Sequence, residues 1–288
     1  MNNHSTEYID NVLTVRFDDI SKGWEQWMLI SADRHHDSVY CNRELEMRHL
    51  KQAQERDALI GDFGDLFCAM QGKYDPRASK DGLRPENKVD DYLGSIVKHA
   101  EEDYAPYAAN WMLIGRGNHD AKVLNKHGTD IINNLADRLR DKHGSNVYAG
   151  GYGGWIRFMF TMNKTRAQSI RLKYHHGAGG GGPVTKGVIQ TNRQAAYIGN
   201  ADIVVNGHTH DAWIVPLGRE DLNSFGNVER SKMEFIRTPG YKDEYFMAKG
   251  IKGFEVETWK APKPIGAVWL RFWFEGSKIY FESTLAVQ

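Results

Sequence analysis

The sequence contains few cysteines and prolines and no long hydrophobic run. Of its 288 residues, 2 are cysteine (Cys41 and Cys68) and 8 are proline. Two cysteines without a CxxC spacing exclude a disulfide-stabilised scaffold and a zinc ribbon. The first residues lack the apolar core of a signal peptide, and no run reaches the roughly 18 apolar residues of a transmembrane helix. We therefore expect a cytoplasmic protein that does not span a membrane.

An excess of charge of one sign is also missing, because 37 Lys and Arg residues balance 37 Asp and Glu residues. Binding to nucleic acid chiefly by charge neutralisation needs a basic excess on one face, so a module of that kind is disfavoured, although a local basic groove is not excluded. No Pro- or Ser-rich linker and no repeat of 20–50 residues divides the chain. We predict one domain over residues 1–288, with a surface insertion near residues 71–86.

A short apolar run that ends in a cluster of Asp, Asn, His and Gly occurs five times. The runs cover residues 27–32, 58–60, 111–114, 170–174 and 201–206. Short runs of this kind predict buried strands. Apolar and charged residues at helical spacing over 42–55, 87–104 and 130–141 predict helices between them. The alternation is typical of an α/β sheet, whose ligands gather at the carboxyl ends of the strands, so the five polar clusters are expected to converge.

Further strand-like segments in the second half predict a second sheet packed on the first. These segments cover residues 155–162, 233–238, 265–274 and 278–284. The last two are separated only by Glu275-Gly276-Ser277 and are typical of a hairpin.

The polar clusters supply carboxylate, imidazole and amide groups, which a hard divalent cation accepts as ligands. The candidate ligands are Asp33, His35, Asp65, Asn118, His175, His208 and His210. Seven ligands are too many for one tetrahedral ion and suit two ions about 3.5–4 Å apart that share a carboxylate. His119 adjoins a candidate ligand and is placed to meet a substrate.

In this order the motifs resemble those of the calcineurin-like metallophosphoesterases, a superfamily that includes purple acid phosphatases, protein phosphatases and nucleases. The matching motifs are Asp33-x-His35, Gly64-Asp65, Gly117-Asn118-His119-Asp120, His175 and Gly207-His208-Thr209-His210. The resemblance implies an α/β fold, a four-layer α/β/β/α sandwich of two mixed sheets.

The resemblance also implies residue roles. One metal would take Asp33, His35, Asp65 and His210, and the other would take Asp65, Asn118, His175 and His208. His119 would be the catalytic acid or a phosphate-stabilising residue.

Two of these assignments have alternatives. Asp62 competes with Asp65, and we prefer Asp65 because a strand over 58–64 has a more usual length than one over 58–61. His176 competes with His175, and family members with a single His before a non-His residue and Gly favour His175. Cys68 stands where the family usually carries an acid.

Two divalent ions would lower the pKa of a bridging water, which would attack phosphorus in line. Mn²⁺ is the favoured ion, with Fe, Zn, Ni or Co as alternatives, because the ligand types do not decide the metal. Arg34 and Arg116 lie within the motif loops and are interpreted as phosphate-binding residues.

The favoured function is a phosphodiesterase, including a nuclease, and the alternatives are a phosphomonoesterase and a non-catalytic metal-binding scaffold. The expected partner is a phosphate-ester substrate, with nucleic acids and nucleotides among the candidates. Within the insertion, Lys73, Arg77, Lys80 and Arg84 form either a cap over an anionic substrate or a solvated face. The sequence predicts no oligomeric state.

Overall fold

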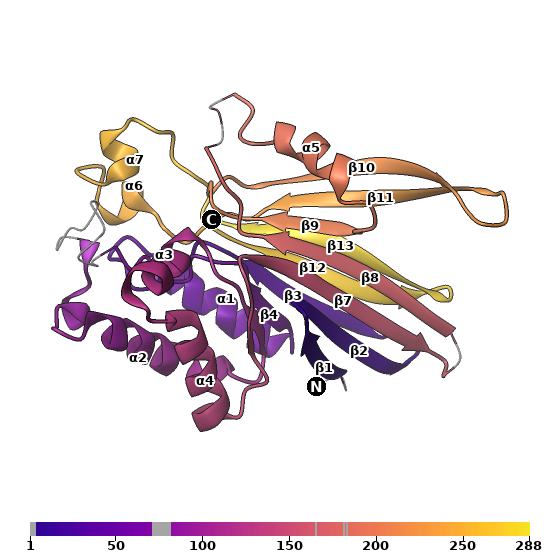
Figure 1. The fold of residues 1–288 in the computed structure, drawn as a ribbon, viewed down its shortest axis with the longest axis horizontal. Helices are drawn as coiled ribbons and strands as arrows, with labels where there is room; N and C mark the ends of the chain where they lie inside the picture. Colours follow the sequence, from indigo (N-terminus) through magenta and orange to yellow (C-terminus); the bar gives the residue numbers. More distant parts are fainter. Residues whose placement is uncertain (1–3, 71–81, 165, 181, 183) are drawn as a thin grey trace.

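The computed structural model describes residues 4–70, 82–164, 166–180, 182 and 184–288. Two mixed sheets form the centre of the structure (Figure 1). The seven-stranded sheet has the order β1-β2-β7-β8-β9-β11-β10, and the six-stranded sheet has the order β13-β12-β3-β4-β5-β6.

The strands of the larger sheet are β1 (His4–Ile9), β2 (Val12–Ile20), β7 (Gly153–Met162), β8 (Arg166–His175), β9 (Ile203–Asn206), β10 (Trp213–Leu222) and β11 (Val228–Arg237). Those of the smaller sheet are β3 (Glu25–Ser31), β4 (Leu59–Asp62), β5 (Trp111–Ile114), β6 (Tyr148–Ala149), β12 (Gly266–Glu275) and β13 (Lys278–Val287). The helices are α1 (Arg43–Glu55), α2 (Tyr92–Tyr104), α3 (Asn118–His127), α4 (Ile131–His143), α5 (Ile189–Tyr197), α6 (Glu244–Met247) and α7 (Phe254–Glu257).

The space between the two sheets is filled by the side chains that alternate along their strands. In β2, Leu13, Val15 and Phe17 are fully buried while their neighbours are partly exposed, as the two-residue period of a strand requires. The ring centroids of Phe158 in β7 and Phe272 in β12 lie 4.8 Å apart, so this contact joins the two sheets directly.

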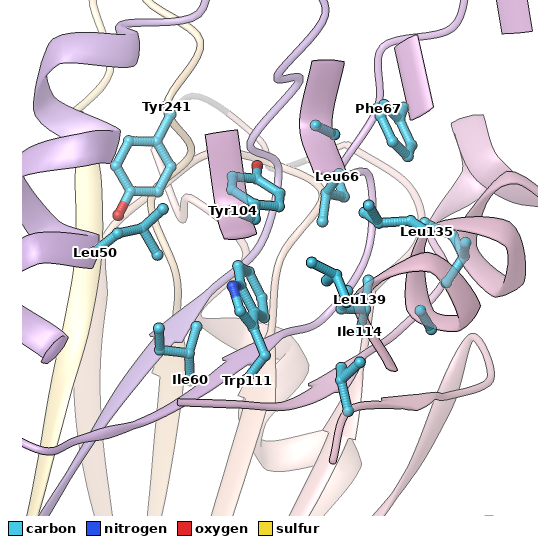
Figure 2. Packing of buried hydrophobic residues seen from close by; sticks show 14 of the residues in the cluster. Leu50, Ile60, Leu66, Phe67, Tyr104, Trp111, Ile114, Leu135, Leu139 and Tyr241 are labelled. Atoms are coloured by element: carbon cyan, nitrogen blue, oxygen red, sulfur yellow. The ribbon is translucent and has the colours of Figure 1, made fainter. Parts of the chain in front are cut away.

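A second core lies between the six-stranded sheet and helices α1, α2 and α4 (Figure 2). Helix α4 places Leu135 and Leu139 toward Trp111 because residues four apart share one face of a helix. The helix begins where the Asp130 side chain accepts a hydrogen bond from the Asn133 amide, and it ends at Gly144 in the left-handed conformation.

A third, smaller core lies on the outer face of the seven-stranded sheet, where Ala195 of α5 packs near Val204 of β9 and Phe235 of β11. Helices therefore cover the outer faces of both sheets, and the expected four-layer α/β/β/α sandwich of two mixed sheets is confirmed. No helix among the described residues has both the length and the apolar composition needed to cross a membrane.

The predicted helices correspond to α1, α2 and α4, and the predicted closing hairpin is β12–β13. Helix α2 begins later than expected, because Pro85–Asn87 forms a separate 3-10 turn and the Asp91 side chain caps Gly94. The sequence did not reveal β1, β2, β10, α3 or α5.

The predicted insertion near 71–86 lies mostly outside the described residues, because the structure describes the chain again only from residue 82. Within its described part, the Arg84 guanidinium donates hydrogen bonds to the carbonyl oxygens of Ser38 (3.0 Å) and Cys41 (3.1 Å). Arg84 therefore stabilises the loop that contains Ser38 and Cys41, and the expectation that it caps a substrate is not supported.

Candidate metal centre

Polar loops from both sheets meet at the edge where the carboxyl ends of their parallel strands lie together. Asp33 follows β3, Asp65 follows β4, Asn118 follows β5, His176 follows β8, and His208 and His210 follow β9. Backbone hydrogen bonds join these loops, from the Asp33 amide to Gly64 O (2.8 Å) and from the Gly207 amide to His176 O (2.9 Å). The position of the cluster therefore follows from strand order, as expected for ligand sites in α/β sheets.

Two groups of ligand atoms lie within this cluster. Asp33, His35 and His210 each offer an atom within 4.8 Å of the other two, and so do Asp65, His176 and His208. The first group contains three of the four residues expected around the first metal. In the second group, His176 takes the place expected for His175.

His176 connects the two groups. Its Nε2 lies 3.2 Å from Asp65 Oδ2 and 3.9 Å from Asp33 Oδ1. The same nitrogen lies 3.2 Å from Asn118 Oδ1, so the expected amide ligand also faces the centre. The other ring nitrogen, Nδ1, donates a hydrogen bond to the carbonyl oxygen of Phe63 (3.1 Å). A backbone acceptor of this kind fixes the orientation of a metal-binding imidazole.

Unpaired polar atoms at the centre fit a cation. Asp33 is fully buried, and its Oδ2 accepts from the His208 amide (2.7 Å), whereas its Oδ1 lies 3.3 Å from His210 Nε2 without a well-aligned hydrogen bond to any described residue. The Nδ1 of buried His35 likewise has no hydrogen-bond partner there. Because leaving such groups unpaired costs free energy, buried carboxylate and imidazole atoms without partners are typical of sites completed by a ligand. The donor set of carboxylates, imidazoles and an amide suits a divalent cation.

The pKa values of His35 and His176 indicate that a positive charge is favourable at the centre. Burial lowers the pKa of His35 well below its ordinary value, and nearby His119 and His210 lower it further, so His35 is the neutral imidazole that can bind a metal. Burial also lowers the pKa of His176, but Asp65 and Asp33 outweigh burial and raise that pKa to about 10. The extra proton on His176 supplies positive charge to two buried carboxylates, which is the role a cation would take over.

Five residues of the centre have a left-handed backbone, with φ of 54° at Asp33, 47° at His35, 55° at Asp65, 73° at His208 and 55° at His210. Such conformations of non-glycine residues cost about 1–3 kcal/mol each and concentrate at functional sites. Their gathering around one point supports a functional role for this cluster.

Close backbone approach explains two glycines of the motifs. At Gly64, where φ is 110°, a Cβ atom would lie 2.6 Å from the Gly117 amide nitrogen and 2.7 Å from His176 Nδ1. At Gly207, a Cβ atom would lie 2.6 Å from Asp33 Oδ2. Any larger residue would push the ligand loops apart.

His119 lies beside the second group at the start of α3. Its backbone amide donates to Asp65 Oδ1 (2.8 Å), and its Nδ1 donates to the carbonyl oxygen of Cys68 (2.5 Å). Its Nε2 is 3.8 Å from Asp65 Oδ2. The ring therefore presents Nε2 toward the centre, as expected for a residue that meets a substrate.

The preference for His175 over His176 is not supported by the structure. His175 is exposed, its ring lies edge-on against Tyr152, and its Nδ1 accepts a hydrogen bond from the Gly177 amide (3.0 Å). His176 is fully buried. The two side chains point to opposite faces because successive residues alternate along a strand, and His176 shares the inner face with Leu172 and Tyr174.

The structure separates the two alternative aspartates. Asp65 lies in the centre, as preferred, whereas the Asp62 carboxylate pairs with Arg34 Nε (2.9 Å) and accepts from the Ser31 hydroxyl (2.9 Å). The length argument behind the preference was wrong, however, because β4 ends at Asp62 and does not extend to residue 64.

The interpretation of Arg34 as a phosphate-binding residue is wrong. Its side chain is fully buried and pairs with Glu46 Oε1 (2.9 Å) as well as with Asp62. Its guanidinium lies 5.0 Å from the ring centroid of Trp111 and 5.2 Å from that of Tyr241. All these contacts belong to the core beneath the helices, so no substrate reaches Arg34.

Arg116 is also turned toward the protein. Its guanidinium donates to the carbonyl oxygen of Gly150 and to Asp130 Oδ2 (2.6 Å). None of these partners belongs to the two ligand groups, so these contacts do not support a phosphate-binding role for Arg116.

Two buried aspartates support the centre without facing it, and only one of them had a clear signal in the sequence. Asp120 Oδ2 accepts from the amides of Asp65 and Gly117 (both 2.9 Å), and only the bond from Gly117, three residues earlier, follows the spacing of a capping box. Asp37 accepts from the amides of Cys68 (2.5 Å) and Ala69 (3.0 Å), which lie too far along the chain for a local motif to reveal.

His175 and His176 form a matched pair for a mutational test of metal binding. His176→Ala should lower the affinity for Mn²⁺ by more than the roughly 10–100-fold typical of losing an outer-shell partner, whereas His175→Ala should leave it unchanged. Calorimetric titration of each variant with Mn²⁺ measures both values. A larger loss in His175→Ala would contradict the placement of His176 at the centre.

Comparison with known proteins adds little at the level of sequence, since no protein-family model and no curated protein matches this chain. Three solved structures resemble it over 90% of its length. They are Thermotoga maritima protein TM1076 (12% identity, 98% of that chain, TM-score 0.31), a metallophosphoesterase from Sphaerobacter thermophilus (14%, 89%, 0.35) and GAP50, the anchor in the inner membrane complex of Plasmodium (11%, 84%, 0.42). At these identities and scores the likeness assigns no activity, so the function is argued from the centre itself.

Proposed function

We propose that this protein is a metal-dependent phosphoesterase of the calcineurin-like type, with Mn²⁺ as the favoured ion. The observation that carries the proposal is the joining of Asp33 and Asp65 through His176 in one buried centre, with His119 at its edge. Asp33, His35 and His210 would hold one ion, and Asp65, Asn118, His176 and His208 would hold the second.

Two divalent ions bound there would polarise the phosphoryl oxygens and lower the pKa of a water molecule, the chemistry that phosphate-ester hydrolysis needs. The chain contributes rigidity. Its ligand side chains extend from loops that are joined to one another by backbone hydrogen bonds, so little reorganisation is needed when a substrate arrives.

His119 would move the proton to the leaving group. Because its Nδ1–H donates to the Cys68 carbonyl oxygen, the neutral ring carries no proton on Nε2. Only the doubly protonated ring has an Nε2–H to give to a departing alkoxide, and Nε2 lies 3.8 Å from Asp65 Oδ2.

We propose a phosphodiester substrate, with single-stranded nucleic acid or nucleotides favoured, because aromatic side chains are exposed on a segment whose first residue contacts the Asp33 loop. Residues 241–264, here called the rim segment, begin where the Tyr241 amide donates to Asp33 O (3.0 Å). In Figure 1, α6 and α7 of this segment lie beyond the ends of the sheets. Trp259, Phe246 and Phe254 of the segment are 94%, 71% and 60% exposed. Exposed aromatic rings suit base stacking, worth about 1–3 kcal/mol per base.

The exposed charges of the rim segment fit the same substrate. Three of its lysines are exposed, against one exposed acid, Glu257; the lysines are Lys249, Lys252 and Lys260. This local basic excess, absent from the chain as a whole, complements a phosphate backbone. A phosphomonoester has no base to stack and gains less from such a surface.

The substrate class is tested by comparing rates on bis(p-nitrophenyl) phosphate, p-nitrophenyl phosphate and single-stranded DNA with added Mn²⁺. We expect the diesters to be cleaved faster than the monoester. A faster rate on p-nitrophenyl phosphate would contradict a phosphodiesterase and favour a phosphomonoesterase. No turnover of any of the three substrates would favour a metal-binding scaffold.

His119→Ala should lower kcat by about 10²–10⁴-fold, the usual contribution of general acid–base catalysis. Mn²⁺ affinity should stay at the value of the unaltered protein, because His119 belongs to neither proposed Mn²⁺ ligand set, and the free energy of unfolding should fall by only about 0.5–1.5 kcal/mol through the lost hydrogen bond to the Cys68 carbonyl oxygen. Steady-state kinetics and calorimetric titration measure the two effects on one preparation. A variant with full activity would remove His119 from the mechanism.

A further inference from the structure

A third group of ligand atoms, containing sulfur, adjoins the two groups already described. Cys68, His35 and His119 each offer an atom within 4.8 Å of the other two. Cys68 is 6% exposed and His35 is 2% exposed, so solvent hardly competes for these atoms. The other two groups offer carboxylate oxygens and imidazoles, and neither contains a thiol.

The backbone holds the Cys68 turn in place. The Cys68 and Ala69 amides both donate to the Asp37 carboxylate, which also accepts from the Tyr92 hydroxyl (2.6 Å). The backbone of Cys68 therefore keeps its position without a bound metal, which limits the positions that the sulfur can take. A ligand whose position is set in advance loses little conformational entropy on binding.

The two imidazoles leave nitrogens for a cation beside this sulfur. His119 uses Nδ1 for the Cys68 carbonyl oxygen, so Nε2 remains as its ligand atom. The His35 and His119 rings meet edge to face, with centroids 5.0 Å apart and planes at 81°. The buried Nδ1 of His35 has no hydrogen-bond partner among the described residues.

We propose that Cys68, His35 and His119 form an additional site, sharing His35 with the first ligand group, for a thiophilic divalent cation, Zn²⁺ above all, and that a cation there inhibits hydrolysis. Thiolate and imidazole ligands select Zn²⁺ and Co²⁺ over Mn²⁺ or Mg²⁺. Binding forms a sulfur–metal bond and releases the thiol proton to solvent.

Inhibition rests on the proposed function, in which His119 gives up a proton. A cation on Nε2 of His119 removes the lone pair that must take up that proton, and it also competes for His35 with the first ligand group. The binding site itself rests only on the geometry of the three side chains, so binding and inhibition are tested separately.

Binding is tested by titrating the full-length, metal-free protein with Co²⁺ alone and recording sulfur-to-cobalt charge-transfer absorption in the near ultraviolet. We expect the band in the unaltered protein and in Cys41→Ser, and its loss in Cys68→Ser. Cys41 is the matched control because its thiol is fully buried beside Glu46 and belongs to none of the three groups. A band that is absent from the unaltered protein, or that persists in Cys68→Ser, would overturn the site.

A measurement on the unaltered protein covers the case in which Cys68→Ser does not fold. X-ray absorption at the zinc edge, on the unaltered protein given Zn²⁺, should show a sulfur neighbour at about 2.3 Å from zinc. Absence of a sulfur neighbour would overturn the site.

Inhibition is tested by adding Zn²⁺ to the Mn²⁺-loaded protein during hydrolysis of bis(p-nitrophenyl) phosphate. The Zn²⁺ concentration for half inhibition should rise by about tenfold or more in Cys68→Ser, the lower end of the 10–100-fold range for weakened metal sites, and should not change in Cys41→Ser. A charge-transfer band without inhibition would keep the site and overturn its inhibitory role. Absence of any hydrolysis would refute the proposed function, while the cobalt band would still report on the site.

Discussion

Asp65→Asn is expected to abolish hydrolysis and to reduce the stabilisation of the protein by Mn²⁺. The change keeps the size of the side chain and its acceptance of the His119 amide, but it removes the negative charge that faces His176 Nε2 at 3.2 Å. Without that charge the second ligand group has no carboxylate, and an amide oxygen is a much weaker partner for a divalent cation.

The stabilisation of the folded protein by Mn²⁺ depends on the ratio of the Mn²⁺ concentration to its dissociation constant. A ligand present at 100 times its dissociation constant stabilises a folded protein by about 2.7 kcal/mol. We expect Mn²⁺ to raise the Tm of the unaltered protein and to raise that of Asp65→Asn by less, because only the first ligand group, Asp33, His35 and His210, keeps its carboxylate. Thermal unfolding with and without Mn²⁺, followed by an assay with bis(p-nitrophenyl) phosphate, measures both losses.

Asp62→Asn is the control, because Asp62 is equally buried three residues earlier and was the alternative ligand. We expect it to be less stable, through its lost partnership with Arg34, while still gaining stability from Mn²⁺. If Asp62→Asn lost the Mn²⁺ effect and Asp65→Asn kept it, the two aspartates would have to exchange roles.

The gathering of Asp33, Asp65 and His208 was predictable from the sequence because each follows a short buried run. The runs before them became β3, β4 and β9, and parallel strands bring their carboxyl ends to a common edge. Elements with a weaker pattern of apolar residues, such as α5, could not be predicted in this way. The left-handed backbone of the ligand residues was not predictable either, because it is imposed by contacts between loops far apart in the chain.

The choice between His175 and His176 was open to a better argument from the same sequence. Ile170, Leu172 and Tyr174 are apolar and alternate with polar residues, which places every second side chain on the inner face. Continuing that alternation by one step brings His176, and not His175, to the inner face. Motif comparison gave the wrong residue because it ignored this alternation.

Arg34 shows the limit of reasoning from neighbours in sequence. It lies between two residues of a motif, yet its partners Glu46 and Asp62 are 12 and 28 residues away, and only the packing of α1 against the sheet that contains β3 and β4 brings them to it. A buried guanidinium and a phosphate-binding guanidinium are indistinguishable in the sequence until those partners are placed.

Arg34→Met is accordingly expected to destabilise the fold by about 3–5 kcal/mol, the cost of removing one partner from a buried ion pair. Glu46 and Asp62 are both fully buried and would lose their shared cation. Arg116→Met should cost at most about 1 kcal/mol, because the Arg116–Asp130 pair is partly exposed. Urea unfolding of the two variants at neutral pH measures the contrast between these arginines.

Lowering the pH should narrow the difference in stability between Arg34→Met and the unaltered protein. Burial raises the pKa of Asp62 to about 6 even with Arg34 opposing it, and losing Arg34 raises it further. A carboxyl whose pKa is higher in the folded state binds more protons there, so folding gains stability as the pH falls through that pKa toward the unfolded value of about 4. Arg34→Lys keeps the charge, but one ammonium cannot replace the guanidinium nitrogens that contact Asp62 and Glu46, so it should recover only part of the stability. A stable Arg34→Lys variant with a greatly raised KM and an unchanged kcat would instead support the interpretation of Arg34 as a phosphate-binding residue.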